Sequence, residues 1–371
     1  MLERLLALAL LFPIPLAASD PLEEPMRQVE RFRGLAFDAP VEVVTVPRAD
    51  LRKTLEAQIA KSSTLPVGEY LSILQALQLL EQDEGALERL MELYEAQVLA
   101  FYDPETRKYY TFDQAPGGAP LDETMAEAVA VHELTHALQD QKFDAGARLR
   151  ALETDWDAQL AYHAVLEGEA TFVMLAALLG RMGVTLDQIT ETDDVVSAIA
   201  AMGALNPGFP ADAPPYFVES LKFPYLRGLE LVVEMYRREG WAGVDRLHAS
   251  PPRSSEEVMD PELYLARTSP GRGACEAGKA TLATTLGAFH WTFLLGEEAG
   301  SGWASDCVRV TRRGSGFQVE GASGWDSEAD AAQFAEELRR FLAGKAVRKP
   351  KVDRKGTAVA FRWFAAAPAA R

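Results

Sequence analysis

The chain has little cysteine, little histidine and too few positive charges to balance its negative ones. Its 371 residues include 2 cysteines, 5 histidines, and 37 Lys and Arg against 55 Asp and Glu, so the formal net charge is −18. Binding to nucleic-acid phosphates needs a basic face, so this acidity argues against a nucleic-acid partner. It also argues against attachment to an anionic membrane surface. We interpret the acidity as a contribution to solubility.

The two cysteines, Cys275 and Cys307, make an even pair. In an exported protein such a pair predicts a disulfide. This one would close a loop of about thirty residues and contribute on the order of 3–4 kcal/mol in the chain-entropy model. Two free buried thiols are the alternative.

No apolar run near the N-terminus is long enough for a comfortable membrane span. The run Leu5–Leu16 is short and contains Pro13 and Pro15. With Ala17-Ala18-Ser19 after it, the run is typical of a secretory signal peptide over residues 1–19, cleaved near Ser19. No cysteine follows, which argues against a lipid anchor. We expect an exported protein, periplasmic or extracellular, without stable membrane insertion; an uncleaved anchor is the alternative.

One stretch carries a recognisable chemical pattern, His132-Glu133-Leu134-Thr135-His136. Several alanines around it favour a helix, and the neighbouring apolar residues provide packing; on a helix, residues four apart share a face. Two imidazoles on one face can bind Zn²⁺, and a glutamate after the first histidine can take a proton from a water at the metal. The pattern therefore predicts a zinc site with Glu133 as general base. A surface helix with two incidental histidines is the alternative.

A catalytic zinc needs a third protein ligand. The metzincin arrangement is excluded, because Gln139 and Lys142 stand where its glycine and third histidine would be. A strongly helical stretch over 156–179 contains two acidic residues in an apolar surrounding, Glu167 and Glu169. They lie about 200° apart on a helix, so they cannot both face one metal.

The motif His132–His136, followed by Glu167-Gly168-Glu169-Ala170, resembles the gluzincin metallopeptidases. That resemblance implies a zincin-like fold, one zinc ion per chain, and Glu167 as the third ligand, with Glu169 as the fallback. Many gluzincins carry an aspartate four residues after this glutamate, which orients a zinc-binding histidine. Here Thr171 stands at that position, so the orienting group must come from elsewhere.

Candidates for the orienting group are Asp157, Glu169 and His163; a satisfied buried histidine is the alternative for His163. The resemblance extends over roughly residues 95–310 and includes segments similar to those of poorly characterised bacterial exported proteins with the same motif. In gluzincins a Tyr or His after the glutamate helix often stabilises the oxyanion. This implies a choice among Tyr225, His248 and Tyr264, with Tyr225 preferred because a rigid Phe223-Pro224-Tyr225 segment would hold it.

The remaining pattern predicts an α+β fold that is mostly helical. Residues 20–95 are a mainly helical N-terminal region with a strand over 41–46. Residues 96–305 are the zincin-like catalytic region, a small sheet with the active-site helix and the glutamate helix. It begins with a hairpin around residues 103–106, whose edge strand can bind an extended peptide; an ordinary hairpin without this role is the alternative. Residues 306–371 are a small C-terminal α+β element.

Within the catalytic region we expect a loop-rich excursion over 181–220 and helices over 226–238, 241–248 and 280–295. In the C-terminal element we expect two strands around residues 307–320, a helix over 327–343 and a last strand over 357–364.

The leading hypothesis is a zinc metallopeptidase that cleaves a peptide or protein substrate, with Glu133 as general base and Tyr225 as oxyanion stabiliser. The alternative is a catalytically inactive zincin-fold protein that serves as a binding or scaffold protein of the cell envelope. An intact Glu133 argues against the alternative, since a non-catalytic zinc site does not need it. The sequence leaves the oligomeric state open.

Overall fold

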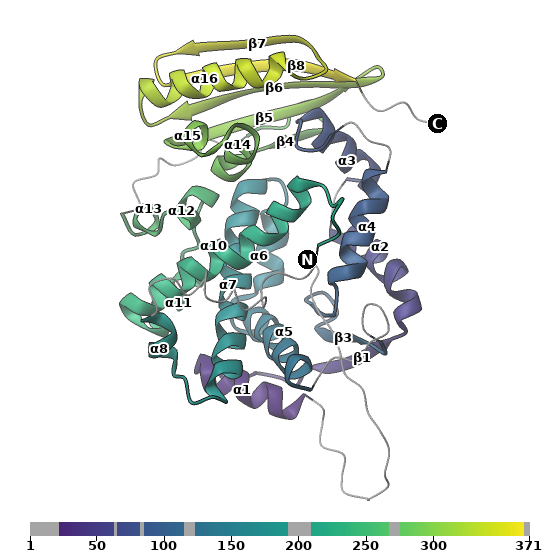
Figure 1. The fold of residues 1–371 in the computed structure, drawn as a ribbon, viewed down its shortest axis with the longest axis vertical. Coiled ribbons are helices and arrows are strands. Elements are labelled where there is room, and N and C mark those ends of the chain that lie inside the picture. Colours follow the sequence, from purple (N-terminus) through teal and green to yellow (C-terminus); the bar gives the residue numbers. More distant parts are fainter. Residues whose placement is uncertain are drawn as a thin grey trace, which may run out of the picture.

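The computed structural model describes residues 22–62, 65–81, 85–114, 123–191, 209–266 and 275–366. The predicted signal peptide, residues 1–19, and its cleavage position near Ser19 lie outside these residues. Helices make up most of the described chain, and a larger sheet lies at one end of the molecule (Figure 1). The chain is therefore α+β and mostly helical, as the sequence predicts.

The described elements are fifteen α-helices, one short 3-10 turn and eight strands. The helices are Glu23–Arg33 (α1), Leu51–Ser62 (α2), Val67–Ala76 (α3), Ala86–Gln97 (α4), Glu123–Phe143 (α5), Ala145–Ala151 (α6), Trp156–Gly180 (α7), Leu186–Thr190 (α8), Pro215–Glu239 (α10), Trp241–Ala249 (α11), Ser255–Met259 (α12), Pro261–Ala266 (α13), Gly287–Leu295 (α14), Glu297–Gly300 (α15) and Glu328–Ala343 (α16), and the 3-10 turn is Arg48–Asp50. The strands are Glu42–Val46 (β1), Ala100–Asp103 (β2), Lys108–Phe112 (β3), Leu282–Thr284 (β4), Trp303–Arg313 (β5), Gly316–Trp325 (β6), Val347–Lys355 (β7) and Ala358–Ala366 (β8).

The small sheet has the strand order β1-β3-β2 and confirms the predicted strand and hairpin. β2 and β3 are antiparallel, whereas β1 pairs parallel to β3. β2 is an edge strand, but all four of its residues are buried and it packs against α5. The hydroxyl of Tyr102 donates to Asp140 at 3.0 Å, which connects this strand to the C-terminal end of α5. Peptide binding at this edge stays a prediction.

The helices α5, α7 and α10 form the centre of the molecule (Figure 1). α7 and α10 cross at Gly168 and Gly228, where the two backbones approach closely. A Cβ atom at Gly228 would lie 1.9 Å from the carbonyl oxygen of Ala164, and one at Gly168 would lie 2.2 Å from the Gly228 backbone. Only glycine permits this approach. The crossing determines which residues of α10 lie beside α5, the helix that carries the motif His132–His136.

α7 is long and apolar enough to cross a membrane by length and composition, yet 72% of its most apolar window is buried inside the protein. Such burial is typical of the core helix of a globular protein.

The C-terminal sheet has the strand order β4-β5-β6-β8-β7, and its pairings are antiparallel. α16 packs along one face, where Phe334 lies 5.0 Å from Trp291 and 4.4 Å from Trp325 between ring centroids. The predicted disulfide joins Cys275 to Cys307 on β5. A disulfide indicates an oxidising, exported environment.

Two predicted helices have different limits in the structure. α10 begins at Pro215, eleven residues before the expected start, so part of the expected loop region over 181–220 is helical; residues 192–208 lie outside the described chain. A proline in the first turn costs no hydrogen bond, because the N–H it lacks has no partner there. The segment Phe223-Pro224-Tyr225 therefore lies inside a helix instead of forming a rigid stretch before one.

The expected helix over 280–295 is a strand followed by a shorter helix. Residues Leu282–Thr284 pair with β5, and α14 starts only at Gly287, whose φ is 78°. The apolar character of this stretch suits either element, and pairing with β5 decides for a strand. The strand β7 also lies where no strand was predicted, because its residues are mostly polar and exposed.

Candidate metal centre

Three predicted metal ligands converge in the described structure. The Nε2 atoms of His132 and His136 lie 3.2 Å apart, and Oε2 of Glu167 lies 3.2 Å from the first and 3.4 Å from the second. Tetrahedral zinc with bonds of about 2.0–2.1 Å separates its ligand atoms by roughly 3.3–3.4 Å. The donor atoms therefore have both the chemistry and the spacing of a metal centre. His132, His136 and Glu167 form a group that can bind a metal ion.

Both histidines come from α5, as the helical period predicts. The apolar side chains between and beside them pack into the core, which fixes the rotation of the helix and turns the histidines toward α7. These core residues are Val131, Leu134, Ala137 and Leu138.

Glu133 lies next to the three ligands. Its side chain is 1% exposed, and Oε1 lies 3.9 Å from Nε2 of His132. The carboxylate is not part of the ligand group but lies beside it, as a general base for a metal-bound water would. The structure thus brings together the four residues His132, Glu133, His136 and Glu167.

Glu167 binds histidines with both of its oxygens. Oε2 faces the two α5 histidines, and Oε1 lies 3.0 Å from Nε2 of His163, one turn earlier on α7. Burial alone would raise the pKa of Glu167, but His136, His132 and His163 hold it well below its ordinary value. His163 thus contacts the carboxylate oxygen that faces away from the α5 histidines, and the lowered pKa favours the ionised form that a metal ligand needs.

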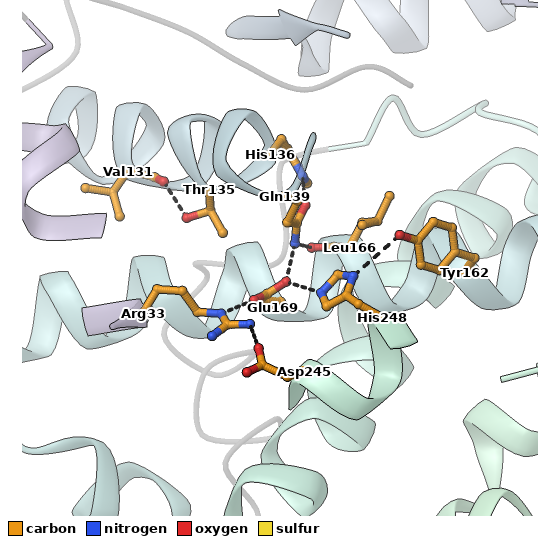
Figure 2. Close-up of polar contacts among 10 residues, drawn as sticks. All are labelled: Arg33, Val131, Thr135, His136, Gln139, Tyr162, Leu166, Glu169, Asp245 and His248. Atoms are coloured by element: carbon orange, nitrogen blue, oxygen red, sulfur yellow. Dashed lines mark hydrogen bonds and ion pairs between the residues drawn. The ribbon is translucent and has the colours of Figure 1, made fainter. Parts of the chain in front are cut away.

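Glu169 is not part of the ligand group and lies in a buried cluster with Arg33, Gln139 and His248 (Figure 2). Its carboxylate accepts hydrogen bonds from Arg33, from Nε2 of His248 at 2.7 Å and from Nε2 of Gln139 at 2.6 Å. Burial would raise the pKa of Glu169, but Arg33 and His248 hold it well below its usual range. The two acidic residues of α7 thus lie on different sides of the helix, as their separation of about 200° requires, and Glu167 is the one at the ligand group.

Of the three candidates for oxyanion stabilisation, Tyr225 is the one beside the ligands. Its ring lies 6.0 Å from that of His132 between centroids, with an interplanar angle of 20°. The other two candidates have partners elsewhere. His248 is fully buried against Glu169, and Tyr264 is buried with its hydroxyl donating to the carbonyl of Ser250 at 3.0 Å. Tyr225 is close because it precedes the crossing glycine Gly228 by one turn of α10.

The orienting groups differ in part from those expected. Asp157 is buried elsewhere and accepts a hydrogen bond from the Ser255 N–H at 2.9 Å. Glu169 does not contact either α5 histidine directly in the hydrogen bonds described. It binds Gln139, whose side-chain oxygen accepts from Nδ1 of His136 at 2.8 Å. Sequence reasoning missed Gln139 in this role and missed Arg33 altogether. The spacing of three residues between His136 and Gln139 on one helix was a usable signal, whereas nothing in the sequence relates Arg33 to Glu169.

Comparisons with known proteins bear on the other end of the chain. A family described as a domain of unknown function (DUF8575) matches residues 267–367, which is about a quarter of the chain and excludes every residue of the candidate centre. No curated protein matches the chain, and no solved structure matches it either. A zincin-like core therefore stays a prediction from the motifs.

Proposed function

We propose that the protein is a zinc-dependent metallohydrolase, and specifically a peptidase. The observation that supports this most strongly is the convergence of His132, His136 and Glu167 with a buried glutamate beside them. A structural zinc site needs four protein ligands and no general base, whereas a catalytic site has three ligands, an open position and a base. The described ligand group, with Glu133 at its side, corresponds to the catalytic type.

In this proposal each residue has one task. His132, His136 and Glu167 hold the zinc, which when bound polarises the scissile carbonyl and lowers the pKa of its water. The carboxylate of Glu133 takes a proton from the attacking water and passes it to the leaving amine, so the proton count balances. The phenol of Tyr225 donates a hydrogen bond to the developing oxyanion.

The site of action belongs to the same proposal. The disulfide and the signal-like residues 1–19 support an exported protein that acts on peptides or proteins in the periplasm or outside the cell.

The test combines metal content with turnover. Wild-type protein should contain one zinc per chain by elemental analysis, and Glu167→Ala should lose it. Glu133→Gln should keep the zinc but lose at least about 100-fold in the rate of cleavage of a broad peptide library, since general-base catalysis contributes about 10²–10⁴-fold.

Two outcomes would redirect the proposal. Wild-type protein without zinc would refute it. Zinc bound by wild type with no cleavage of any peptide would favour the alternative, a zincin-fold binding or scaffold protein. The substitution of Thr171 for the aspartate common in gluzincins is the feature that agrees with that alternative.

A further inference from the structure

The side-chain amide of Gln139 lies between a metal ligand and a buried charge (Figure 2). Its Oε1 is 2.8 Å from Nδ1 of His136. Its Nε2 is 3.0 Å from the carbonyl oxygen of Leu166 and 2.6 Å from Oε2 of Glu169. Gln139 is 1% exposed, so water does not compete for these hydrogen bonds.

The partners of Gln139 determine which way its amide points. A backbone carbonyl accepts and cannot donate, and an ionised carboxylate does the same. The two hydrogens of the amide nitrogen must therefore point to Leu166 and Glu169, and the amide oxygen must face His136. An oxygen that can only accept requires a proton on Nδ1 of His136. In neutral imidazole the proton on Nδ1 leaves Nε2 with its lone pair, and Nε2 is the atom that faces Glu167 and His132.

We propose that Gln139 is a positioning residue that holds His136 in the Nδ1–H tautomer required for metal binding through Nε2. This inference rests on the proposed metal site and deepens it. In many gluzincins an aspartate at the position of Thr171 orients a zinc histidine. Here an amide from the motif helix itself orients His136 instead, and its polarity is imposed by the Leu166 carbonyl and by Glu169.

The charge that imposes this polarity is itself held by distant segments. Arg33 at the end of α1 pairs with Glu169, and both side chains are 1% exposed. Arg33 also pairs with Asp245 of α11, and its guanidinium lies 4.6 Å from the ring centre of Trp241. His248 of α11 contributes the third donor to Glu169. The orientation of His136 therefore depends on α1, α7 and α11 as well as on α5, and α1 is part of the support of the centre.

The test reads the tautomer directly in metal-free protein. With only 5 histidines in the chain, long-range proton–nitrogen NMR spectra of ¹⁵N-histidine-labelled protein can be assigned with single-histidine variants. At a pH well above the ordinary imidazole pKa, His136 should show the Nδ1–H pattern in wild type. Gln139→Met, which keeps the length but removes the acceptor, should shift His136 toward the Nε2–H form favoured by free imidazole.

Zinc affinity provides the second measurement, by competition with a chelator. Gln139→Met should bind zinc about 10- to 100-fold more weakly, the usual cost of losing an orienting partner of a metal ligand. The matched control is Gln141→Met on the same helix. Gln141 contacts the backbone of Asp38 and Ala39 instead of the centre, so its variant should keep both the tautomer and the zinc affinity of wild type.

A wild-type His136 in the Nε2–H form would overturn the inference, whether or not the variants fold. A Gln139→Met protein with wild-type tautomer and zinc affinity would overturn it as well. The proposed function fails separately. If metal-free wild type shows the Nδ1–H form but binds no zinc at any concentration, the positioning of His136 stands and the metal site does not.

Discussion

The helical region and the C-terminal sheet bury acidic side chains in different ways. In the helical region the buried carboxylate of Glu169 faces the cation Arg33. In the sheet region the buried carboxylate of Asp306 accepts from four neutral groups, the backbone N–H groups of Leu286 and Gly287 and the indoles of Trp291 and Trp303. Arg33 and His248 hold the pKa of Glu169 low, whereas burial raises the pKa of Asp306.

The different surroundings of Glu169 and Asp306 indicate different roles for the two buried carboxylates. The donors around Asp306 close the turn before α14, and a large apolar cluster makes up most of the core beside the sheet. An ion pair such as Arg33–Glu169 is a costly way to stabilise a core, since apolar residues of similar size often do as well or better. Its direct connection to Gln139 and His136 gives a reason for its presence. The buried pair of Arg33 and Glu169 is therefore connected to the candidate metal centre, whereas Asp306 supports a turn of the C-terminal sheet region.

The largest expected effect comes from removing the buried cation. Arg33→Met leaves Glu169 without its cationic partner and should cost about 3–5 kcal/mol in the free energy of unfolding, with weaker zinc binding as well. Chemical unfolding and chelator competition measure the two effects. Arg340→Met in α16 is the matched control, because its pair with Glu336 is exposed at 63% and 71% and should contribute little. Equal effects of both variants would contradict the distinction between the two regions.

An apolar truncation in the sheet should separate stability from metal binding. Phe334→Ala removes a fully buried ring from between α16 and the sheet and should cost about 3–5 kcal/mol of unfolding free energy. Zinc affinity of the folded variant should equal that of wild type, because no described contact joins Phe334 directly to the three ligand residues. Gln333→Ala, at the exposed neighbour on the same helix, should leave both quantities unchanged. A loss of zinc affinity in Phe334→Ala would show that the sheet also supports the site.

The smallest expected effect concerns pH: the contributions of Glu169 and Asp306 to the free energy of unfolding should change with pH in opposite directions. The pKa of Glu169 is lowered from 4.5 by folding, so its contribution to stability is present above 4.5 and is lost as the pH falls below that value. The pKa of Asp306 is raised from 3.8, so its contribution is present below 3.8 and is lost as the pH rises above it.

Melting midpoints of metal-free protein across the acid range test these signs. The difference between wild type and Glu169→Gln should grow with pH, and that between wild type and Asp306→Asn should shrink, each by on the order of a few degrees. Parallel curves for the two variants would show that the two carboxylates are not ionised differently in the folded protein.

Much of the fold could be predicted because the signals are local. The alternation in β5 and β6, the turn of the β2–β3 hairpin and the periodicity of α5 and α16 each depend on neighbours in the chain. The start of α10 and the strand β4 could not be predicted. Pro214-Pro215 is typical of a loop until packing against α7 supports a helix, and Leu282–Thr284 becomes a strand only by pairing with β5.

The sequence by itself determined the pair His132 and His136 and the adjacent Glu133, because a spacing of four residues on a helix brings side chains to one face wherever that helix packs. Together with the resemblance to gluzincins, it also limited the predicted third ligand to one of two glutamates on one helix. Only the tertiary structure decided between them, because α7 is buried almost all round and has no polar face to indicate its rotation. The close crossing of α7 and α10 at Gly168 and Gly228 sets that rotation. It turns Glu167 to the histidines, and Glu169 to Gln139 and to Arg33, a residue 136 positions away in the chain.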